Sequence, residues 1–282
     1  MRSDGRVVEV TDQGLAGVEG DLTGTGHYGG WVLTHQSFSR PVSCRAAVAM
    51  NENGHAMTDT RHAAWDTYAQ TKPQRRAANA KGETTWFNWT QHPDHGPGAE
   101  LLALPTGGRV LDLGCGAAGN LAHLATLGMR ALGVDLSSAQ LSKACERWPD
   151  VNGMELHQGE ALGFLAQQEP FDAIYSVFGA AYFTDPGLTL PAVFDRLTPG
   201  GVFAMSQHPP VDGCYGCQAS YIPRGPEEDP AIVKRWDHTP ETWAAMFEEH
   251  GFNDVTATVL PAPATGRRRI GTLLVRGVRG VQ

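Results

Sequence analysis

The chain has 282 residues, of which 41% are hydrophobic, and its 22 Lys and Arg against 30 Asp and Glu give a formal net charge of −8. That charge disfavours nucleic acid as a partner, because phosphate backbones are bound by dense positive surfaces. No apolar run approaches the roughly 20 residues of a membrane span. The five cysteines are too sparse for a disulfide scaffold. We therefore expect a soluble, cytoplasmic protein with no membrane partner.

The first hundred residues divide at about residue 57. Residues 1–56 are rich in Gly, Thr and Ser and show no sustained period, which predicts a disordered extension; a start at Met50 or Met57 is the alternative. Residues 57–100 are predicted to form a helical lid, with a helix over 60–80 kinked near Pro73 and a short helix over 94–104. The aromatic cluster at 84–89 either covers the edge of the core or lines a ligand site.

A glycine-rich turn follows the first predicted strand, at residues 110–113. Gly114, Gly116 and Gly119 have the G-x-G-x-x-G spacing that allows a sharp bend and a close approach of the backbone to a ligand. Apolar residues at helical spacing come next, so the turn leads into a helix N-terminus. Nicotinamide enzymes, flavin enzymes and methyltransferases share this spacing, and it also occurs in loops without a ligand.

Three carboxylates near this turn narrow the choice. Asp112 stands where a nicotinamide-binding turn usually carries an apolar residue, and an acid there suits a ligand with an ammonium group. Asp135 ends the next predicted strand, about 20 residues past the first glycine, where an acid can bind both hydroxyls of a ribose. Glu160 follows a third predicted strand at 154–158 and is expected beside an adenine amino group.

Beyond these acids, strands and helices continue to alternate, which predicts a parallel sheet with helices on both faces. Ser137 and Gln140 form a capping box at the start of the helix after Asp135. The loop at 178–183 leaves the carboxyl end of a buried strand, where parallel sheets place their ligands. The remaining predictions are a strand at 171–177, a helix broken around Pro191, a strand at 202–206, an insertion at 207–235, a helix capped by Thr239, and strands at 255–260 and 270–275.

Together, the motifs Asp112-Leu-Gly-Cys-Gly116, Gly133-Val-Asp135 and Gly159-Glu-Ala161 resemble those of the class I S-adenosylmethionine-dependent methyltransferases, with Glu160 in place of the usual Asp. The resemblance covers about residues 101–275. It implies a Rossmann-like domain over 101–282 with a closing antiparallel hairpin and a cap insertion at 207–235, and S-adenosylmethionine as cofactor. The expected cofactor contacts are Tyr68, Asp112, Gly114, Cys115, Gly116, Asp135, Leu136, Gly159, Glu160, Ala161 and Ser176.

The methyl acceptor is expected at the same edge of the sheet. An aromatic wall suits a small, largely apolar molecule, and the expected acceptor contacts are Trp86, Tyr182, Phe183 and Trp236. Two histidines are candidate general bases: His208, after the fifth strand in a Ser-x-His-Pro segment, and His238, before the last helix. Solvated or structural histidines are the alternative for both.

The sequence is also compatible with other chemistries. Cys214-x-x-Cys217 has the spacing of half a zinc site, but a single such pair more often holds two free thiols, so we expect no metal. A nicotinamide-dependent oxidoreductase would need only the glycine turn and Asp135. A protein that binds S-adenosylmethionine without catalysis would carry the same motifs.

Overall fold

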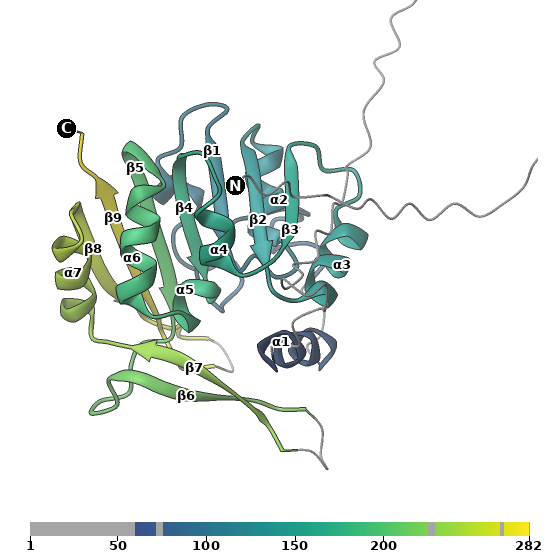
Figure 1. Cartoon of the computed structure of the whole chain (residues 1–282). Helices are drawn as coiled ribbons and strands as arrows, with labels where there is room; N and C mark the ends of the chain where they lie inside the picture. Colours follow the sequence, from purple (N-terminus) through teal and green to yellow (C-terminus); the bar gives the residue numbers. More distant parts are fainter. Residues whose placement is uncertain (1–59, 72–75, 225–228, 266–267, 282) are drawn as a thin grey trace, which may run out of the picture. The chain divides into compact units, whose positions relative to one another are not determined.

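The structure is a computed structural model that describes residues 60–71, 76–224, 229–265 and 268–281 (Figure 1). The extension predicted at 1–56 lies outside the described residues. None of the helices in the described part of the chain is both long enough and apolar enough to cross a membrane.

A seven-stranded sheet of order β3-β2-β1-β4-β5-β9-β8 forms the centre of the fold. Strands β1 to β5 pair in parallel, whereas β9 runs antiparallel to both β5 and β8. This arrangement confirms the predicted Rossmann-like sheet with its closing antiparallel hairpin. The strands are β1 (Arg109–Leu113), β2 (Arg130–Asp135), β3 (Met154–Gln158), β4 (Phe171–Val177), β5 (Leu197–Gln207), β8 (Phe252–Leu260) and β9 (Thr272–Arg279).

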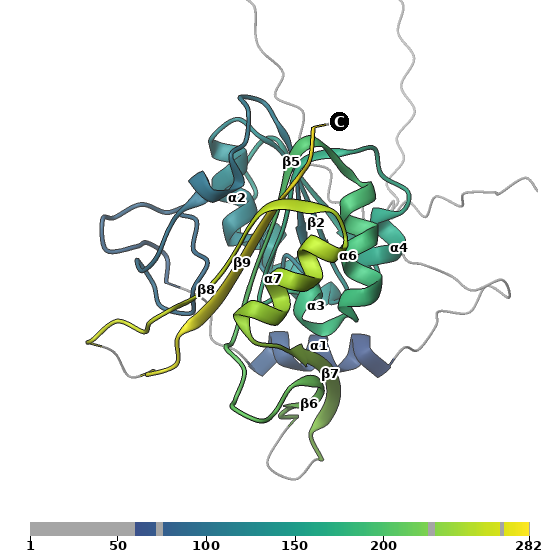
Figure 2. The same ribbon diagram turned by 90° about the vertical axis from the view of Figure 1, so that its left-hand side faces the viewer.

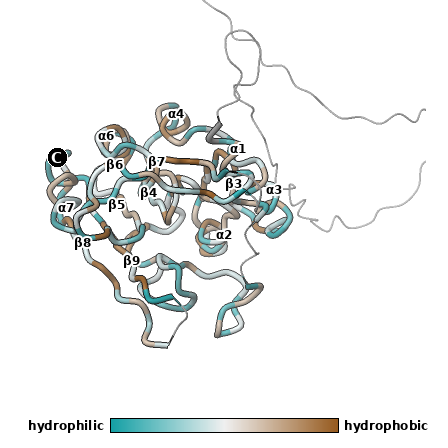
Figure 3. The backbone as a smooth tube through the Cα atoms, turned by 90° about the horizontal axis from the view of Figure 1, so that it is seen from below, coloured by the Kyte–Doolittle hydropathy of each residue, from teal (hydrophilic) through white to brown (hydrophobic). Residues whose placement is uncertain are grey.

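Helices cover both faces of this sheet (Figure 2). On one face, α2 (Gly119–Thr126) and α3 (Ser138–Arg147) bury leucines and alanines against the strands. On the other face, α4 (Ala161–Leu165), α6 (Pro186–Asp195) and α7 (Pro240–Glu249) enclose a second apolar cluster. Seen from below, hydrophilic residues colour much of the outer side of helices such as α3 (Figure 3). Burial of both faces explains why the central strands read as continuous apolar runs.

Three predicted helices have other bounds in the structure. Helix α1 covers Thr60–Thr71, and residues 76–80 are not helical, so the prediction of a helix to residue 80 was too long. The expected helix over 94–104 is a single 3₁₀ turn, η1 (Ala99–Leu102). Helix α6 continues through Pro191, where a break was predicted. Because proline has no N–H, the helix loses one intrahelical hydrogen bond at Pro191. Burial of Leu190 and Val193 against the sheet compensates for this loss.

The insertion after β5 contains a two-stranded antiparallel sheet that the sequence did not predict. Its strands are β6 (Gly216–Ile222) and β7 (Ala231–Asp237). The hairpin and α1 share a small apolar cluster. Its buried members are Ala64 of α1 and Ile222, Ala231 and Val233 of the hairpin, and Trp65, Tyr68 and Phe183 pack against them. The lid segment and the insertion, about 150 residues apart in the chain, thus meet beside the carboxyl ends of the parallel strands (Figure 1).

Candidate functional site

Two turns at the carboxyl edge of the sheet touch through glycines. Gly114 ends β1 with a φ of +82°, and a Cβ on it would lie 2.4 Å from the backbone nitrogen of Ala180. Gly179, in the turn after β4, would place its own Cβ 2.4 Å from the carbonyl oxygen of Leu113. Only glycine fits either position, and this contact lets the two loops share one ligand space.

Asp135 links the end of β2 to the glycine turn. Its Oδ2 accepts a hydrogen bond from the Gly116 N–H at 2.8 Å, and its Oδ1 accepts one from the Ser137 N–H at 2.8 Å. Burial raises the pKa of this carboxyl above its ordinary value, although the two N–H donors oppose the shift. The Ser137 hydroxyl in turn accepts from the Gln140 N–H at 3.1 Å and caps α3, as predicted.

The other two acids lie on neighbouring strand ends. Asp112 is buried on β1 next to Tyr175, whose pKa is held well above its ordinary value by burial and by the Asp112 carboxylate. Glu160 caps α4, since its Oε2 accepts a hydrogen bond from the Gly163 N–H at 2.6 Å. This capping role holds Glu160 in position. Helix α4 itself was not predicted from the sequence.

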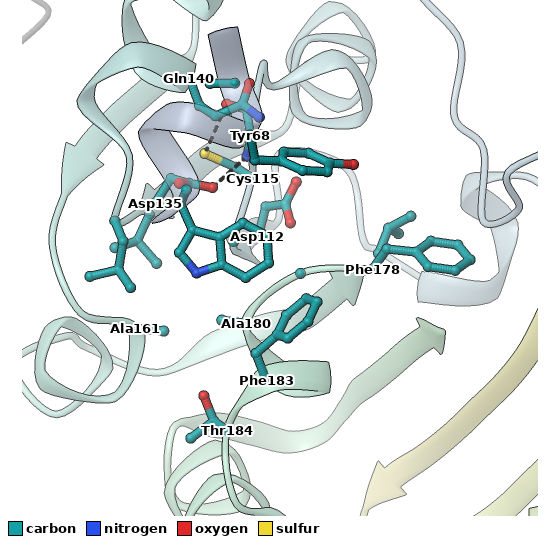
Figure 4. A pocket seen from close by; sticks show the side chains of 18 of the residues that line it. Tyr68, Asp112, Cys115, Asp135, Gln140, Ala161, Phe178, Ala180, Phe183 and Thr184 are labelled. Carbon is teal, nitrogen blue, oxygen red and sulfur yellow. Dashed lines mark hydrogen bonds between the residues drawn. The ribbon is translucent and has the colours of Figure 1, made fainter. Parts of the chain in front are cut away.

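A cavity of about 990 Å³ opens where these elements meet, and most of the predicted cofactor contacts line it. In Figure 4, Tyr68 of α1 and the carboxylates of Asp112 and Asp135 border the same space, with Phe178 and Phe183 on other sides of it. The predicted residues that line the cavity are Tyr68, Asp112, Gly114, Cys115, Gly116, Asp135, Leu136, Gly159, Glu160, Ala161, Phe183 and Trp236.

The remaining predicted contacts, Ser176, Trp86 and Tyr182, do not line this cavity. Ser176 is buried and supports the two turns, because its hydroxyl donates to the Leu113 carbonyl at 2.8 Å and accepts from the Ala181 N–H at 3.2 Å. Trp86 is half-buried elsewhere. Its neighbour Trp89 is fully buried in the core, where the indole N–H donates to the Gly98 carbonyl at 2.8 Å.

Tyr182 fastens the turn after β4 to the hairpin. It belongs to the short helix α5 (Ala180–Phe183), and its hydroxyl donates to Asp237 Oδ1 at 3.2 Å. Arg235 Nε donates to the other oxygen of the same buried carboxylate at 2.9 Å. Burial and the Asp237 charge raise the pKa of Tyr182, so its phenol keeps its proton and stays a donor.

His208 stands behind the cavity wall. Its ring lies 5.1 Å from the ring of Phe178, which lines the cavity, and its Nε2 lies 3.1 Å from Nε2 of Gln91. Gln91 Oε1 accepts a 2.6 Å hydrogen bond from Arg268, so the Gln91 amide group donates to His208 Nε2 and the neutral ring carries its proton on Nδ1. Burial, with Arg235 and Arg268 nearby, lowers the pKa of His208.

His238 packs edge-on against Trp243, with ring centroids 5.3 Å apart, and does not line the cavity. Burial lowers the pKa of His238, although the nearby Asp237 carboxylate opposes this. Its Nε2 is buried and, within the described residues, has no hydrogen-bond partner. The lowered pKa favours the neutral ring, and the buried Nε2 can reach an acceptor only after local movement.

Helix α1 lines the cavity and is hydrogen-bonded to the start of α3. Asp66 Oδ1 accepts hydrogen bonds from the Ser137 hydroxyl at 2.6 Å and from the Ala139 N–H at 3.1 Å, which places a carboxylate at the N-terminus of α3. Trp65, one residue earlier, lies with its ring 4.6 Å from that of Phe183 and lines the cavity. Helix α1 therefore joins the ends of β2 and β4.

Several cavity residues were not predicted as ligand contacts from the sequence: Trp65, Gln140, Phe178, Lys234 and Arg268. The i, i+3 spacing of Trp65 and Tyr68 was a usable signal for the first of them. Lys234 lies in the predicted insertion and Arg268 in the link between the last two predicted strands, where no local pattern marks a ligand contact, so only tertiary contacts identify them.

The Cys214 and Cys217 thiols are free and exposed. In the part of the chain that the structure describes, no three His, Cys, Asp or Glu side chains come together as metal ligands.

Comparison with known proteins agrees with this geometry. Residues 110–201, from β1 into β5, match the family described as "Methyltransferase domain". The match to a methyltransferase domain therefore covers the parallel strands and the glycine turn that border the cavity. A solved structure, a putative S-adenosylmethionine-dependent methyltransferase from Listeria monocytogenes, shares the fold with a TM-score of 0.50 at 21% identity, over 64% of this chain and 96% of that one.

Two curated relatives match parts of this chain. Phosphoethanolamine N-methyltransferase 1 of Triticum aestivum is 31% identical over 163 residues, which cover 56% of this chain and 31% of that protein. Trans-aconitate 2-methyltransferase of Variovorax paradoxus (strain S110) is 35% identical over 114 residues, which cover 39% of this chain and 43% of that protein. The chain thus spans less than half the length of either relative.

Proposed function

We propose that the chain transfers a methyl group from S-adenosylmethionine to a small-molecule acceptor inside the cavity. The observation that carries this proposal is the convergence of three acids, from the ends of three adjacent parallel strands, on the cavity beside the Gly114 turn. Each acid suits one polar part of the cofactor: Asp112 the ammonium group, Asp135 the ribose hydroxyls and Glu160 the adenine amino group.

The structure fits this assignment at Asp135 in particular. Each of its oxygens accepts one backbone hydrogen bond, and a carboxylate oxygen can accept two. One acceptor position therefore remains on each oxygen, which matches the two neighbouring hydroxyls of a ribose. At Glu160, capping occupies Oε2 and leaves Oε1 for an amino group.

When bound, S-adenosylmethionine supplies an electrophilic methyl group, so the protein mostly has to align donor and acceptor and exclude water. Alignment falls to the two glycine turns and to Asp135, which backbone hydrogen bonds hold in place. Exclusion of water falls to the cover, in which Trp65 and Tyr68 of α1 pack with the β6–β7 hairpin and Phe183.

His208 and His238 stay candidate bases for an acceptor that must lose a proton. Neither lines the cavity, so a base role requires Phe178 or the Gln91 amide to move aside for His208. His208→Ala tests this role by single-turnover kinetics at saturating cofactor. Loss of a general base lowers the rate by about 10² to 10⁴-fold with cofactor affinity unchanged; a fall below about threefold would assign His208 to structure.

Support for a small acceptor comes from the cavity and from the relatives. A space of about 990 Å³ for cofactor and acceptor together is the size of a small-molecule site. Both curated relatives are named for small-molecule acceptors, phosphoethanolamine and trans-aconitate. The net charge of −8 disfavours nucleic acid.

Calorimetric titration of the protein with S-adenosylhomocysteine and with NAD tests the cofactor assignment. S-adenosylhomocysteine should bind and NAD should not, because the buried Asp112 carboxylate disfavours a nicotinamide dinucleotide there. Binding of NAD with equal or higher affinity would move the chain to the oxidoreductase alternative. Binding of S-adenosylhomocysteine without methyl transfer to any acceptor would favour a non-catalytic role.

A further inference from the structure

The charged side chains around the cavity are unevenly distributed. Asp112, Asp135 and Glu160 all belong to the edge formed by β1, β2 and β3, where we place the cofactor. Lys234 of β7 and Arg268 of the β8–β9 connection line the cavity from elements on the acceptor side. The cavity therefore offers an anionic half to the cofactor and a cationic half to whatever lies beside it.

Other charged residues of the lining are engaged locally. On α3, Lys143 donates to the Ala69 carbonyl and Arg147 to the Arg76 carbonyl, so both hold the segment around α1. Asp185 is the one further acid in the lining of the described cavity; it is exposed, and its Oδ1 accepts from the Gly187 N–H at 2.8 Å to cap α6. Asp185 therefore does not neutralise the positive charges of Lys234 and Arg268 at short range.

Among the described residues, neither of these two cations has an acidic partner. Across the ranges that the structure describes, no carboxylate lies within 4.0 Å of the Lys234 ammonium or the Arg268 guanidinium. In a chain whose acids outnumber its bases by 30 to 22, two cations that face a cavity without counter-charges point to a negative ligand.

Arg268 is also held in position toward the acceptor side. Its Nη1 donates to Gln91 Oε1 at 2.6 Å, and Gln91 donates onward to His208 Nε2 at 3.1 Å. His208 contacts Phe178 of the cavity wall. Arg268 is exposed, and this hydrogen bond uses one of its five guanidinium N–H donors and leaves the others for a ligand.

We propose that the methyl acceptor carries an anionic oxygen group, a carboxylate or a phosphate, that pairs with Arg268 and Lys234 while its apolar part lies against Phe178, Phe183 and Trp236. This inference rests on the proposed function, since it concerns the second substrate of the same cavity. Arg268 supplies a planar, bidentate donor pair and Lys234 a compact charge, the combination that suits either group.

The test uses three aromatic probes of similar size: benzoate, phenyl phosphate and uncharged benzamide. Each is titrated into the protein saturated with S-adenosylhomocysteine, and binding is followed by saturation-transfer NMR at low salt. At least one of the two anions should bind about tenfold or more tightly than benzamide, because a charge-assisted hydrogen bond outweighs a neutral one by that margin. Which anion binds more tightly distinguishes a carboxylate acceptor from a phosphate ester.

Matched variants assign the effect to the residue. Arg268→Gln should remove most of the preference for the anion, whereas Arg269→Gln, an exposed neighbour outside the cavity lining, should keep it. S-adenosylhomocysteine affinity should be the same in both variants. Equal binding of benzamide and both anions, or equal effects of the two substitutions, would overturn the proposal. Failure to bind S-adenosylhomocysteine would instead contradict the proposed function, and the probes would still report on the unliganded protein.

Discussion

Replacement of Asp135 by asparagine should separate cofactor binding from folding. Burial raises the pKa of Asp135, so the folded state penalises its charge, and Asn has the shape of the neutral acid. The protonated Asp135 carboxyl therefore stabilises the folded protein at pH values below its ordinary pKa, and this contribution is lost as the pH rises through the raised pKa of the folded state. At pH 7 the variant therefore loses a backbone hydrogen bond but also a buried charge, and its stability should change by about 1 kcal/mol or less.

Cofactor affinity should fall much further. Each ribose hydroxyl that donates to the carboxylate contributes about 1.5 to 3 kcal/mol, and an amide oxygen replaces one of these bonds with a neutral one worth about 1 kcal/mol. The net loss is at least about 2 kcal/mol, which corresponds to a rise in Kd of roughly 30-fold or more. Since the hydroxyls prefer the ionised form, wild-type affinity should also decline as pH falls through the raised pKa of Asp135.

Calorimetry with S-adenosylhomocysteine and thermal unfolding of the same samples measure the two effects. Asp172→Asn is the matched control, because Asp172 is a half-buried acid that accepts the Arg109 N–H at 2.7 Å at the opposite end of the sheet. The control should bind normally. If Asp135→Asn binds within about twofold of wild type, or no more weakly than the control, the ribose assignment is wrong.

Three further substitutions test other parts of the site. Gly114→Ala should lower the free energy of unfolding by at least about 3 kcal/mol, because the new Cβ would lie 2.4 Å from a backbone nitrogen at a residue with positive φ. Gly119→Ala is the control: its Cβ would meet nothing within 4 Å, so the free energy of unfolding should change by less than about 1 kcal/mol, and equal effects would contradict the contact between the turns. Asp66→Ala should speed hydrogen exchange in α1 selectively, since α1 loses its two bonds to α3; unchanged exchange would show that apolar packing alone holds the cover. Gln91→Glu should raise the pKa of His208 in an NMR titration, because a carboxylate then lies beside Nε2; an unchanged or lower value would contradict the contact between these two side chains.

The parallel sheet and the convergence of the three acids on one cavity could be predicted because their signals are local. A strand, the Gly114 turn and a helix start lie within a few residues of one another, and Asp135 directly follows its strand. Ser137 is also a local signal, since a helix cap needs only its own helix. The carboxyl ends of parallel strands meet at one edge, so the acids had to converge.

The side of the cavity formed by α1, the β6–β7 hairpin and the β8–β9 connection could not be predicted to the same depth. Strands β6 and β7 alternate exposed and buried residues, but prolines around them made the segment look like a loop. Contacts of α1 with β7, and of Gln91 with both His208 and Arg268, join residues more than about 100 positions apart, which no local pattern encodes. The core position of Trp89 shows the same limit, because an aromatic residue looks alike in a core and in a binding site.

Incubation of the purified protein with isotopically labelled S-adenosylmethionine and a fractionated metabolite extract tests the central claim most directly. Mass spectrometry of the products should find the label in a small molecule, and we expect that product to retain, or to have esterified, a carboxylate or phosphate group. Asp135→Asn at subsaturating cofactor should reduce the same product by roughly 30-fold or more, in line with the loss in affinity. Label found only in protein, RNA or DNA, or in no product while S-adenosylhomocysteine binds tightly, would contradict the proposed function.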